Sequence, residues 1–384
     1  MSRAKYDPVK EHEVIGVYPG IKGFSIGFAQ GGVPESPRFY RPIETRENFK
    51  MLFRGETPYW IPECGWILCD VQEFRPRQHP DNLANHQLLD GGEEVDFKQI
   101  GNVITGWFDL EYQWESLSGG ATVRPGLIKV PDITKWEDYI TMPDLDAMDW
   151  KAIAKDNTVF LGTDKVNQLG IQFGFWERLM NIMGVAEAAI ALIDEDQKDG
   201  VHRFFDRLAD LYSDYIRRIC ACCPIDSVFM HDDWGHQTGP FFSLAVCREM
   251  IVPYMKRVID VCHDLGLVFE HHSCGKAEAL VPAMIEEGDD LWFPQPTLND
   301  VDGMLEKYNG ASIAFAVVNP VLTSEMSEEE VRKLAREWVD KYKGKRALLT
   351  QNIYFPEKSD PTKYPIFKDE VYAYSRMAYQ DADQ

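Results

Sequence analysis

The hydrophobic and polar positions follow their most regular pattern in the C-terminal half of the chain. Short apolar runs that are typical of buried strands alternate there with longer segments whose apolar residues recur at the spacing of one helix face. This succession predicts a parallel sheet, either closed into a barrel or open and doubly wound. The pairs of predicted strand and following helix are 226–231 with 243–264, 267–272 with 276–287, 290–294 with 299–308, 312–318 with 327–343, and 346–352 with a last helix within 366–380.

The ends of these helices carry their own signals. Ser327 and Glu330 have the spacing of a capping box, in which each side chain bonds the backbone amide of the other residue at a helix start. Glycines then follow the predicted helices as stop signals. They are Gly266, Gly288, Gly310 and Gly344.

The N-terminal half is less regular. Helices are predicted over 43–54, 175–193 and 201–220, and a first strand is expected to end near Glu63. A short run at 159–162 is also strand-like.

Two stretches have no clear period. Over residues 1–41, the lack of a period predicts an irregular N-terminal extension that lies over the main fold. Residues 66–150 are rich in turns and aromatic side chains and predict an insertion over the mouth of the barrel, because long ordered insertions often carry substrate contacts. The whole chain, 1–384, is expected to form one domain.

The predicted strands all end in polar residues, and this decides between the two parallel folds. In a barrel such ends converge on one mouth, whereas an open sheet would spread them along an edge. No Gly-x-Gly-x-x-Gly follows any predicted strand, which disfavours a dinucleotide-binding sheet. We therefore predict a (β/α)8 TIM barrel. The polar strand ends are Asp232 and Asp233, His272 and Cys274, Gln295, Asn319, and Gln351 with Asn352.

Composition narrows the class of protein. The chain has 384 residues, of which 45% are hydrophobic, so it can bury a large core. Its formal net charge of −22 argues against nucleic acid or an anionic membrane as the main partner. No apolar run approaches the ~18 residues of a membrane span, and the N-terminus lacks the apolar stretch of a signal peptide. We expect a cytoplasmic protein whose eight cysteines are free thiols.

One stretch combines three possible metal ligands. Glu270, His272 and Cys274 alternate along a predicted strand, so their side chains point to the same face. A carboxylate, an imidazole and a thiol at a strand end could hold zinc. Equally, they could be buried polar groups satisfied by their neighbours. By contrast, the cysteines at 220, 222 and 223 follow a helical pattern and are expected to be core residues.

Several segments resemble the uroporphyrinogen decarboxylase superfamily. The segment 229–235 (Phe-Met-His-Asp-Asp-Trp-Gly) is similar to the fifth-strand region of that superfamily, and Pro-Tyr at 253–254 to the pair in the helix that follows. The His-Ser-Cys-Gly segment at 272–275 matches its His-x-Cys-Gly, and 48–56 its opening helix. The resemblance implies a TIM barrel of this type. It is strongest over 43–62 and 200–352.

The superfamily contains two chemistries. Tetrapyrrole decarboxylases carry an arginine-rich motif after the first strand, where this chain reads Glu-Cys-Gly-Trp at 63–66 without an arginine. Corrinoid-dependent methyltransferases hold zinc through His-x-Cys and a later cysteine. His272 and Cys274 match the first two ligands, but no cysteine follows Cys274, so Glu270 is the candidate for the third. The resemblance therefore implies a methyltransferase, with a decarboxylase or a non-catalytic corrinoid-binding barrel as alternatives.

The expected reaction moves a methyl group from a small donor, preferably an aryl methyl ether, to a separate corrinoid protein that carries cobalamin. Zinc would polarise the ether oxygen, and an acid would protonate the leaving phenolate. Asp232 and Asp233 would normally face opposite ways, so one of them is expected to bind backbone amides instead. The candidate catalytic residues are Asp232, Asp233 and His236, and the candidate substrate-binding residues are Glu63, Trp234, Gln351 and Asn352.

Overall fold

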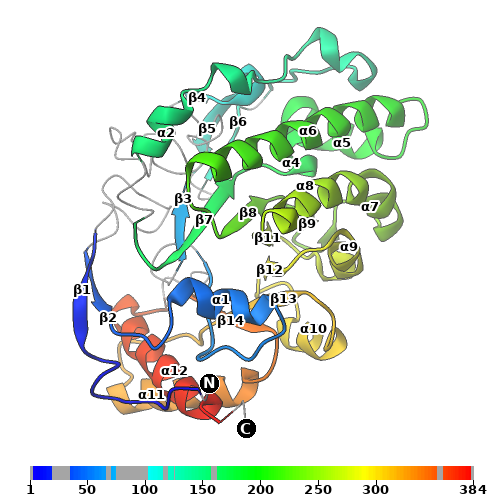
Figure 1. Cartoon of the computed structure of the whole chain (residues 1–384). Coiled ribbons are helices and arrows are strands. Elements are labelled where there is room, and N and C mark those ends of the chain that lie inside the picture. Colours follow the sequence, from blue (N-terminus) through cyan, green and yellow to red (C-terminus); the bar gives the residue numbers. More distant parts are fainter. Residues whose placement is uncertain are drawn as a thin grey trace.

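The fold is built on a curled sheet of seven parallel strands in the order β14-β13-β12-β11-β8-β7-β3 (Figure 1). The computed structural model describes residues 3–19, 35–65, 71–74, 103–115, 120–124, 126–156, 162–352 and 358–381. The strands are β3 (Val71–Phe74), β7 (Val166–Ile171), β8 (Ser227–His231), β11 (Val268–Ser273), β12 (Leu291–Pro294), β13 (Ala314–Val318) and β14 (Ala347–Thr350).

The segment predicted as the first strand lies beside β14 at the free edge of this sheet. Glu63 forms a single parallel bridge with Leu349, and the amide of Cys64 donates to the Leu349 carbonyl at 2.8 Å. The parallel curled sheet with helices outside it is a TIM-type fold, as predicted. The count of eight strand–helix units stays a prediction.

Helices surround the outside of the sheet (Figure 1). The predicted helix over 175–193 is divided at Gly184, whose φ of 89° is outside the helical range. The predicted helix over 243–264 is divided at Ile251, because Pro253 fits only the first turn of a helix. The helices are α4 (Phe175–Met183), α5 (Val185–Ala191), α6 (Lys198–Cys222), α7 (Leu244–Met250), α8 (Val252–Asp264), α9 (Val281–Glu287), α10 (Val301–Lys307), α11 (Glu328–Tyr342) and α12 (Tyr364–Tyr379).

Alternation along the strands separates two apolar layers. The outer layer packs between the sheet and the helices, and it includes Leu349 and the buried face of α6. The inner layer fills the barrel interior, and it includes Phe229, Phe293 and Leu348. Because Leu348 and Leu349 belong to different layers, the side of the sheet on which a residue lies can be read from its parity in the strand.

The N-terminal segment contains more regular structure than predicted. Strands β1 (Val14–Tyr18) and β2 (Ser36–Phe39) pair antiparallel. Glu11 is buried against Arg376 of α12, with Oε2 2.9 Å from Nε. The segment is thereby fastened to the C-terminal helix.

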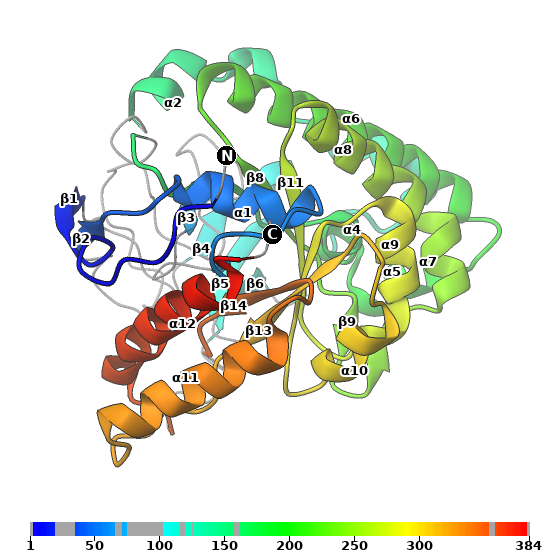
Figure 2. The same ribbon diagram turned by 60° about the horizontal axis from the view of Figure 1, so that its bottom comes forward.

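Helix α1 (Thr45–Phe53) closes the end of the sheet at which the strands begin. Its Lys50 reaches Asp226, the residue before β8, with 2.7 Å between Nζ and Oδ1. Figure 2 shows α1 across the middle of the surrounding helices. The opposite end, where the strands terminate, is the end at which TIM-type folds place their functional sites.

The described part of the predicted insertion contributes β3 to the main sheet and forms a separate three-stranded antiparallel sheet. Tyr112 of that small sheet stacks on Phe173, which follows β7, with 5.1 Å between ring centroids. The small sheet therefore packs near the carboxyl end of β7. Its elements, with the nearby helix, are β4 (Val103–Thr105), β5 (Glu111–Glu115), β6 (Gly120–Val123) and α2 (Trp150–Asp156).

The strand-like run at 159–162 falls mostly outside the described residues. The cysteines near the end of α6 pack against the outer layer, and burial raises the pKa of Cys220 to about 11.

Within the described residues, no helix combines the length and the apolar character that crossing a membrane requires.

Candidate metal centre

The carboxyl ends of β8 and β11 bring together four side chains that can bind a metal ion. His231 ends β8 and Asp233 follows it, while His272 lies in β11 and Cys274 follows that strand. One ligand atom from each residue lies within 4.8 Å of the others. This grouping contains the His272 and Cys274 of the sequence prediction, together with Asp233.

The register of the two strands explains the grouping. His231 and His272 are directly paired across the parallel β8–β11 ladder, and their ring centroids are 4.8 Å apart. Because side chains alternate, Asp233 and Cys274 follow on the same face two residues later. The cluster therefore lies on the inner face of the sheet, at the carboxyl-terminal end of the inner apolar layer.

The distances within the cluster suit a tetrahedral zinc ion. Nε2 of His272 is 3.3 Å from Sγ of Cys274, and Nε2 of His231 is 3.7 Å from Oδ1 of Asp233. Zinc bonds of about 2.0–2.3 Å place neighbouring ligands of a tetrahedral ion about 3.3–3.8 Å apart. Nitrogen and thiolate sulfur are also the donors that zinc prefers, so the residues present fit this ion.

Two glycines let the loops after β8 and β11 approach each other. A Cβ on Gly275 would lie 2.1 Å from the backbone carbon of Gly235, and one on Gly235 would lie 2.7 Å from the amide nitrogen of Lys276. Gly275 also has a φ of +75°, in the left-handed region. The Asp-Trp-Gly and His-x-Cys-Gly segments therefore depend on each other sterically.

Burial sets the protonation of the two His-x-Cys residues. Burial, with the neighbouring His231, lowers the pKa of His272 to about 3, so its imidazole is neutral at neutral pH as a metal ligand must be. Burial, with Asp233, raises the pKa of Cys274 to about 11. A metal cation would reverse this effect and deprotonate the thiol.

Glu177 of α4 orients His231 from the other side. Its Oε2 lies 2.7 Å from Nδ1 of His231, which leaves Nε2 turned toward Asp233 and Cys274. Burial raises the pKa of Glu177 to about 8, and although burial opposes it, Glu177 and Asp233 raise the pKa of His231 well above its usual value. A carboxylate that fixes the far nitrogen of a histidine is the usual partner of a metal-binding imidazole.

Asp232 faces away from the cluster. Its fully buried carboxylate accepts the amides of Trp176 and Glu177, at 3.2 and 2.8 Å, in the first turn of α4. A Cβ on Gly174 would lie 2.4 Å from the Asp232 side chain, so a glycine is needed there. The carboxylate thus serves as a helix cap, as expected for one of the two aspartates.

Trp234 is a core residue of the outer layer. It is fully buried, its ring lies 4.5 Å from that of His271, and its indole N–H donates to Asp232 at 2.9 Å. Its amide donates to the hydroxyl of Ser273 at 2.9 Å. Trp234 thus braces the loop that carries Asp233.

Glu270 lies one layer deeper in the barrel than the cluster. Its Oε2 accepts from Nε2 of Gln168 at 2.9 Å. Among the described residues, the group with converging ligand atoms does not include it. Glu270 shares the inner face with His272, as the alternation requires, but it is placed with Gln168.

The other predicted site residues lie apart from the cluster. His236 is exposed and its ring packs on Phe241, 5.3 Å between centroids. Glu63 pairs with Lys368 of α12, with 2.5 Å between Oε2 and Nζ. Asn352 donates its amide to Oδ1 of Asn319 at 2.7 Å, and Gln351 is half-buried at the end of β14.

Sequence reasoning did not assign a site role to His231 or Glu177. His231 was available, because it precedes Asp233 by two positions on a strand that ends in polar residues. Glu177 is 54 residues away from His231 in the chain, and no local pattern connects them.

Comparison with known proteins places the fold. No protein-family model and no curated protein matches the sequence. Among solved structures, a methyltransferase from Methanosarcina mazei superposes with a TM-score of 0.52 and 14% identity, over 89% of this chain and 99% of that one. A glycosylated endo-β-1,4-xylanase from Gloeophyllum trabeum gives 0.37 and 9%, over 60% of this chain and 82% of that one. At such identities the first likeness supports the fold, and the second is too distant to add to it.

Proposed function

We propose that this chain is a zinc-assisted methyltransferase that moves a methyl group from a small donor, preferably an aryl methyl ether, to the cobalamin of a separate corrinoid protein. The observation that carries the proposal is the convergence of His231, Asp233, His272 and Cys274 at the carboxyl ends of two adjacent strands. The full-length likeness in fold to a methyltransferase supports the same class of reaction.

His231, His272 and Cys274 would hold the metal, which leaves one coordination position for substrate, as in catalytic zinc sites. Bound zinc would supply Lewis acidity at the ether oxygen. The cobalamin of the partner protein would supply the nucleophile that takes the methyl group.

Two side chains of this chain have further roles in the proposed reaction: Glu177 orients a metal ligand, and Asp233 acts on the leaving oxygen. Glu177 holds the Nδ1 side of His231 and so keeps Nε2 directed into the cluster. Asp233 accepts the Cys274 amide at 2.5 Å through Oδ1, and its side chain is 26% exposed, so its carboxyl group is in contact with solvent. We assign Asp233 as the acid that protonates the departing phenolate.

The test is a methylation assay with purified, zinc-loaded protein. Reduced cobalamin is mixed with a panel of methyl ethers, methylamines and methyl thiols, and methylcobalamin is followed by its absorption spectrum. We expect turnover with at least one aryl methyl ether. A zinc-loaded protein that methylates cobalamin with no member of the panel contradicts the proposal.

Variants tie the activity to the cluster. His272→Ala and Cys274→Ala are expected to lose both stoichiometric zinc and turnover. Cys222→Ala, which removes a thiol at the end of α6 outside the cluster, serves as the matched control and should keep both.

A further inference from the structure

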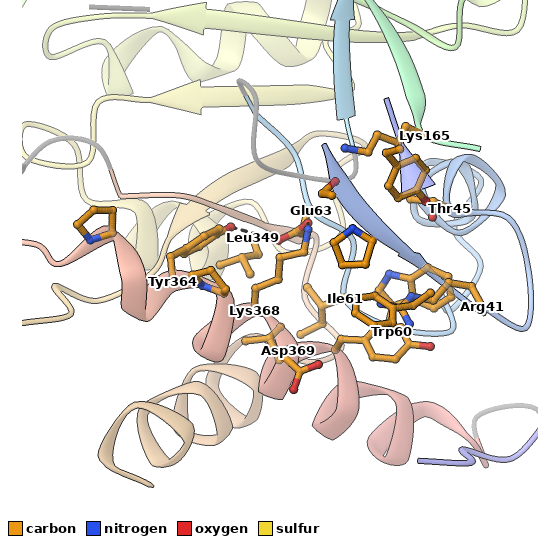
Figure 3. A pocket seen from close by; sticks show the side chains of 18 residues that line it. Arg41, Thr45, Trp60, Ile61, Glu63, Lys165, Leu349, Tyr364, Lys368 and Asp369 are labelled. Atoms are coloured by element: carbon orange, nitrogen blue, oxygen red, sulfur yellow. Dashed lines mark hydrogen bonds and ion pairs between the residues drawn. The ribbon is translucent and has the colours of Figure 1, made fainter. Parts of the chain in front are cut away.

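Several buried acids of this chain face a cation or a hydroxyl donor. Glu63 turns toward Lys368 and Tyr364 of α12 in the cavity drawn in Figure 3, where it accepts from the lysine at 2.5 Å and from the tyrosine hydroxyl at 3.1 Å. Glu11 is paired with Arg376 in the same way. Such partners offset the free energy that the burial of a charge costs.

The turn between α9 and β12 contains two acids without such partners. Glu287 is the last residue of α9, Asp289 precedes β12, and both side chains are fully buried. Neither Oε1 nor Oε2 of Glu287 accepts a hydrogen bond from the described residues, and the same holds for Oδ1 of Asp289. The turn lies inside the continuously described stretch 162–352. These oxygens are therefore free to bind a cation.

His271 completes a group of three possible metal ligands. One ligand atom each from His271, Glu287 and Asp289 lies within 4.8 Å of the others, and Nδ1 of the histidine is 3.0 Å from Oδ2 of Asp289. Bonds of about 2.1 Å place neighbouring ligands of an octahedral ion about 3.0 Å apart. Gly288, with a φ of 104° in the left-handed region, lets the chain turn between the two acids.

The second nitrogen of His271 fixes the state of the first. Nε2 lies 3.3 Å from the carbonyl oxygen of Asp232, so this nitrogen carries the hydrogen and donates it. In a neutral imidazole Nδ1 then presents a lone pair to the Asp289 carboxylate, and a cation between the two turns this repulsion into attraction. A histidine whose other N–H binds a backbone carbonyl is the usual arrangement of a metal ligand.

A divalent cation would also balance the charge of the site. The carboxylates of Glu287 and Asp289 carry two negative charges in a place that solvent does not reach. Without the cation a proton takes its place, because burial and the charge of Asp289 raise the pKa of Glu287 well above its usual value. The pH dependence of stability that this proton causes is therefore measured on chelator-treated protein.

We propose that His271, Glu287 and Asp289 bind a divalent transition-metal ion, with Mn²⁺ as the ion that fits the donor set. Two carboxylates favour a hard ion such as Mg²⁺ or Mn²⁺, the imidazole favours the transition metal of these two, and no ligand of the site is a thiol. Because all three ligands are fully buried, the ion would have a structural role and no contact with substrate.

This site is separate from the cluster at the carboxyl ends of β8 and β11. His271 and His272 are neighbours in β11, so their side chains lie on opposite faces of the sheet. The ion would connect the turn after α9 to β11 and, through the Asp232 carbonyl, to the loop after β8. The proposal is independent of the methyl transfer assigned to the cluster.

Manganese binding to the His272→Ala variant tests the proposal, because this variant lacks a ligand of the cluster. The chain is unfolded in urea with a chelator, refolded with Mn²⁺ and dialysed, since a closed site takes up its ion as the chain folds. Bound Mn²⁺ is counted by electron paramagnetic resonance after release in acid. We expect one Mn²⁺ per chain. A chain that regains its native circular dichroism without bound manganese overturns the proposal.

A second substitution in the His272→Ala background locates the ion. Glu287→Gln should weaken Mn²⁺ binding at least about tenfold, because a neutral amide replaces a charged ligand. Glu286→Gln is the matched control, since that neighbouring carboxylate is on the surface and pairs with Arg248, and it should keep the ion. Mn²⁺ should also raise the urea midpoint of the control and leave that of Glu287→Gln unchanged. Equal manganese binding by the two variants overturns the proposal.

Discussion

Two buried acidic residues near the candidate metal centre, Glu177 and Glu270, lie at different depths in the fold. Glu270 and His272 share one face of β11, but Glu270 is one layer deeper and bonds Gln168. Glu177 comes from α4 and bonds the far side of His231. Residue type and alternation alone predict that Glu270 binds the metal. In the structure, the carboxyl group that contacts the cluster belongs to Glu177, which bonds His231.

This difference predicts opposite results for two equivalent substitutions. Glu177→Gln should weaken zinc binding about 10–100-fold, because an amide replaces the carboxyl group that fixes Nδ1 of His231. Glu270→Gln should leave zinc affinity unchanged. Competition with a chromophoric chelator measures both affinities, and the two variants are each other's control. Release of zinc by Glu270→Gln alone would make Glu270 a ligand after all.

Gly275 should tolerate no side chain. Gly275→Ala combines a left-handed φ with a contact of 2.1 Å to the backbone of Gly235, so we expect a loss of about 2 kcal/mol or more in the free energy of unfolding. Urea denaturation measures this loss. Gly239→Ala, in the same loop region but facing open space, should be close to wild type. If the two variants were equally stable, this would contradict the close approach of the loops after β8 and β11.

At the scale of the element, the start of α4 depends on a side chain from another strand. Asp232→Ala would leave two buried amides of α4 without their acceptor, so we expect a loss of about 2–4 kcal/mol in the free energy of unfolding. Asp232→Asn keeps one oxygen acceptor and should lose less. Chemical denaturation of both variants measures the difference, and equal losses would show that the capping bonds do not matter.

The C-terminal strands and helices could be predicted from sequence because local patterns specify them. The observed β8, β12, β13 and β14 lie within the predicted runs, β11 extends one residue beyond its run, and the capping box at Ser327 is present. Strand β7 was missed because Val166–Ile171 mixes polar and apolar residues, all of them buried. The side chains of Asn167 and Gln168 donate to the Pro224 carbonyl and to Glu270, partners that no local pattern reveals.

The candidate site was predictable only in part, for the same reason. His272 and Cys274 are recognisable as a local motif, and the polar end of β8 points to Asp233. The pairing of His231 with His272 depends on the register of two strands that are separated by two helices. Such register is a tertiary property, so the sequence alone left His231 without a role.

At the scale of the whole molecule, a buried acidic network links the outer layer to the candidate metal centre. Asp289 lies 3.0 Å from Nδ1 of His271, and Glu287 shares this fully buried site. Nε2 of His271 donates to the carbonyl of Asp232 at 3.3 Å, next to Asp233. The network connects α9 to the loop after β8 at the expense of burying two carboxyl groups together.

This network should make global stability depend on pH. Burial, and then the charge of Asp289, raise the pKa of Glu287 well above its usual value of 4.5. The folded chain therefore keeps a proton that the unfolded chain releases, so stability falls as pH rises from about 4.5 toward the raised pKa, by at most about 1.4 kcal/mol per pH unit for this group. Glu287→Gln removes this dependence and should gain on the wild type as the pH increases.

Urea denaturation between about pH 5 and pH 8 measures the effect as the difference between wild type and Glu287→Gln, in which the other titrating groups cancel. Glu286→Gln is the matched control, because that neighbouring carboxylate is on the surface and pairs with Arg248, which lowers its pKa. Its difference from wild type should be flat over this range. A flat difference for Glu287→Gln as well would mean that Glu287 is charged in the folded chain, and it would contradict the prediction.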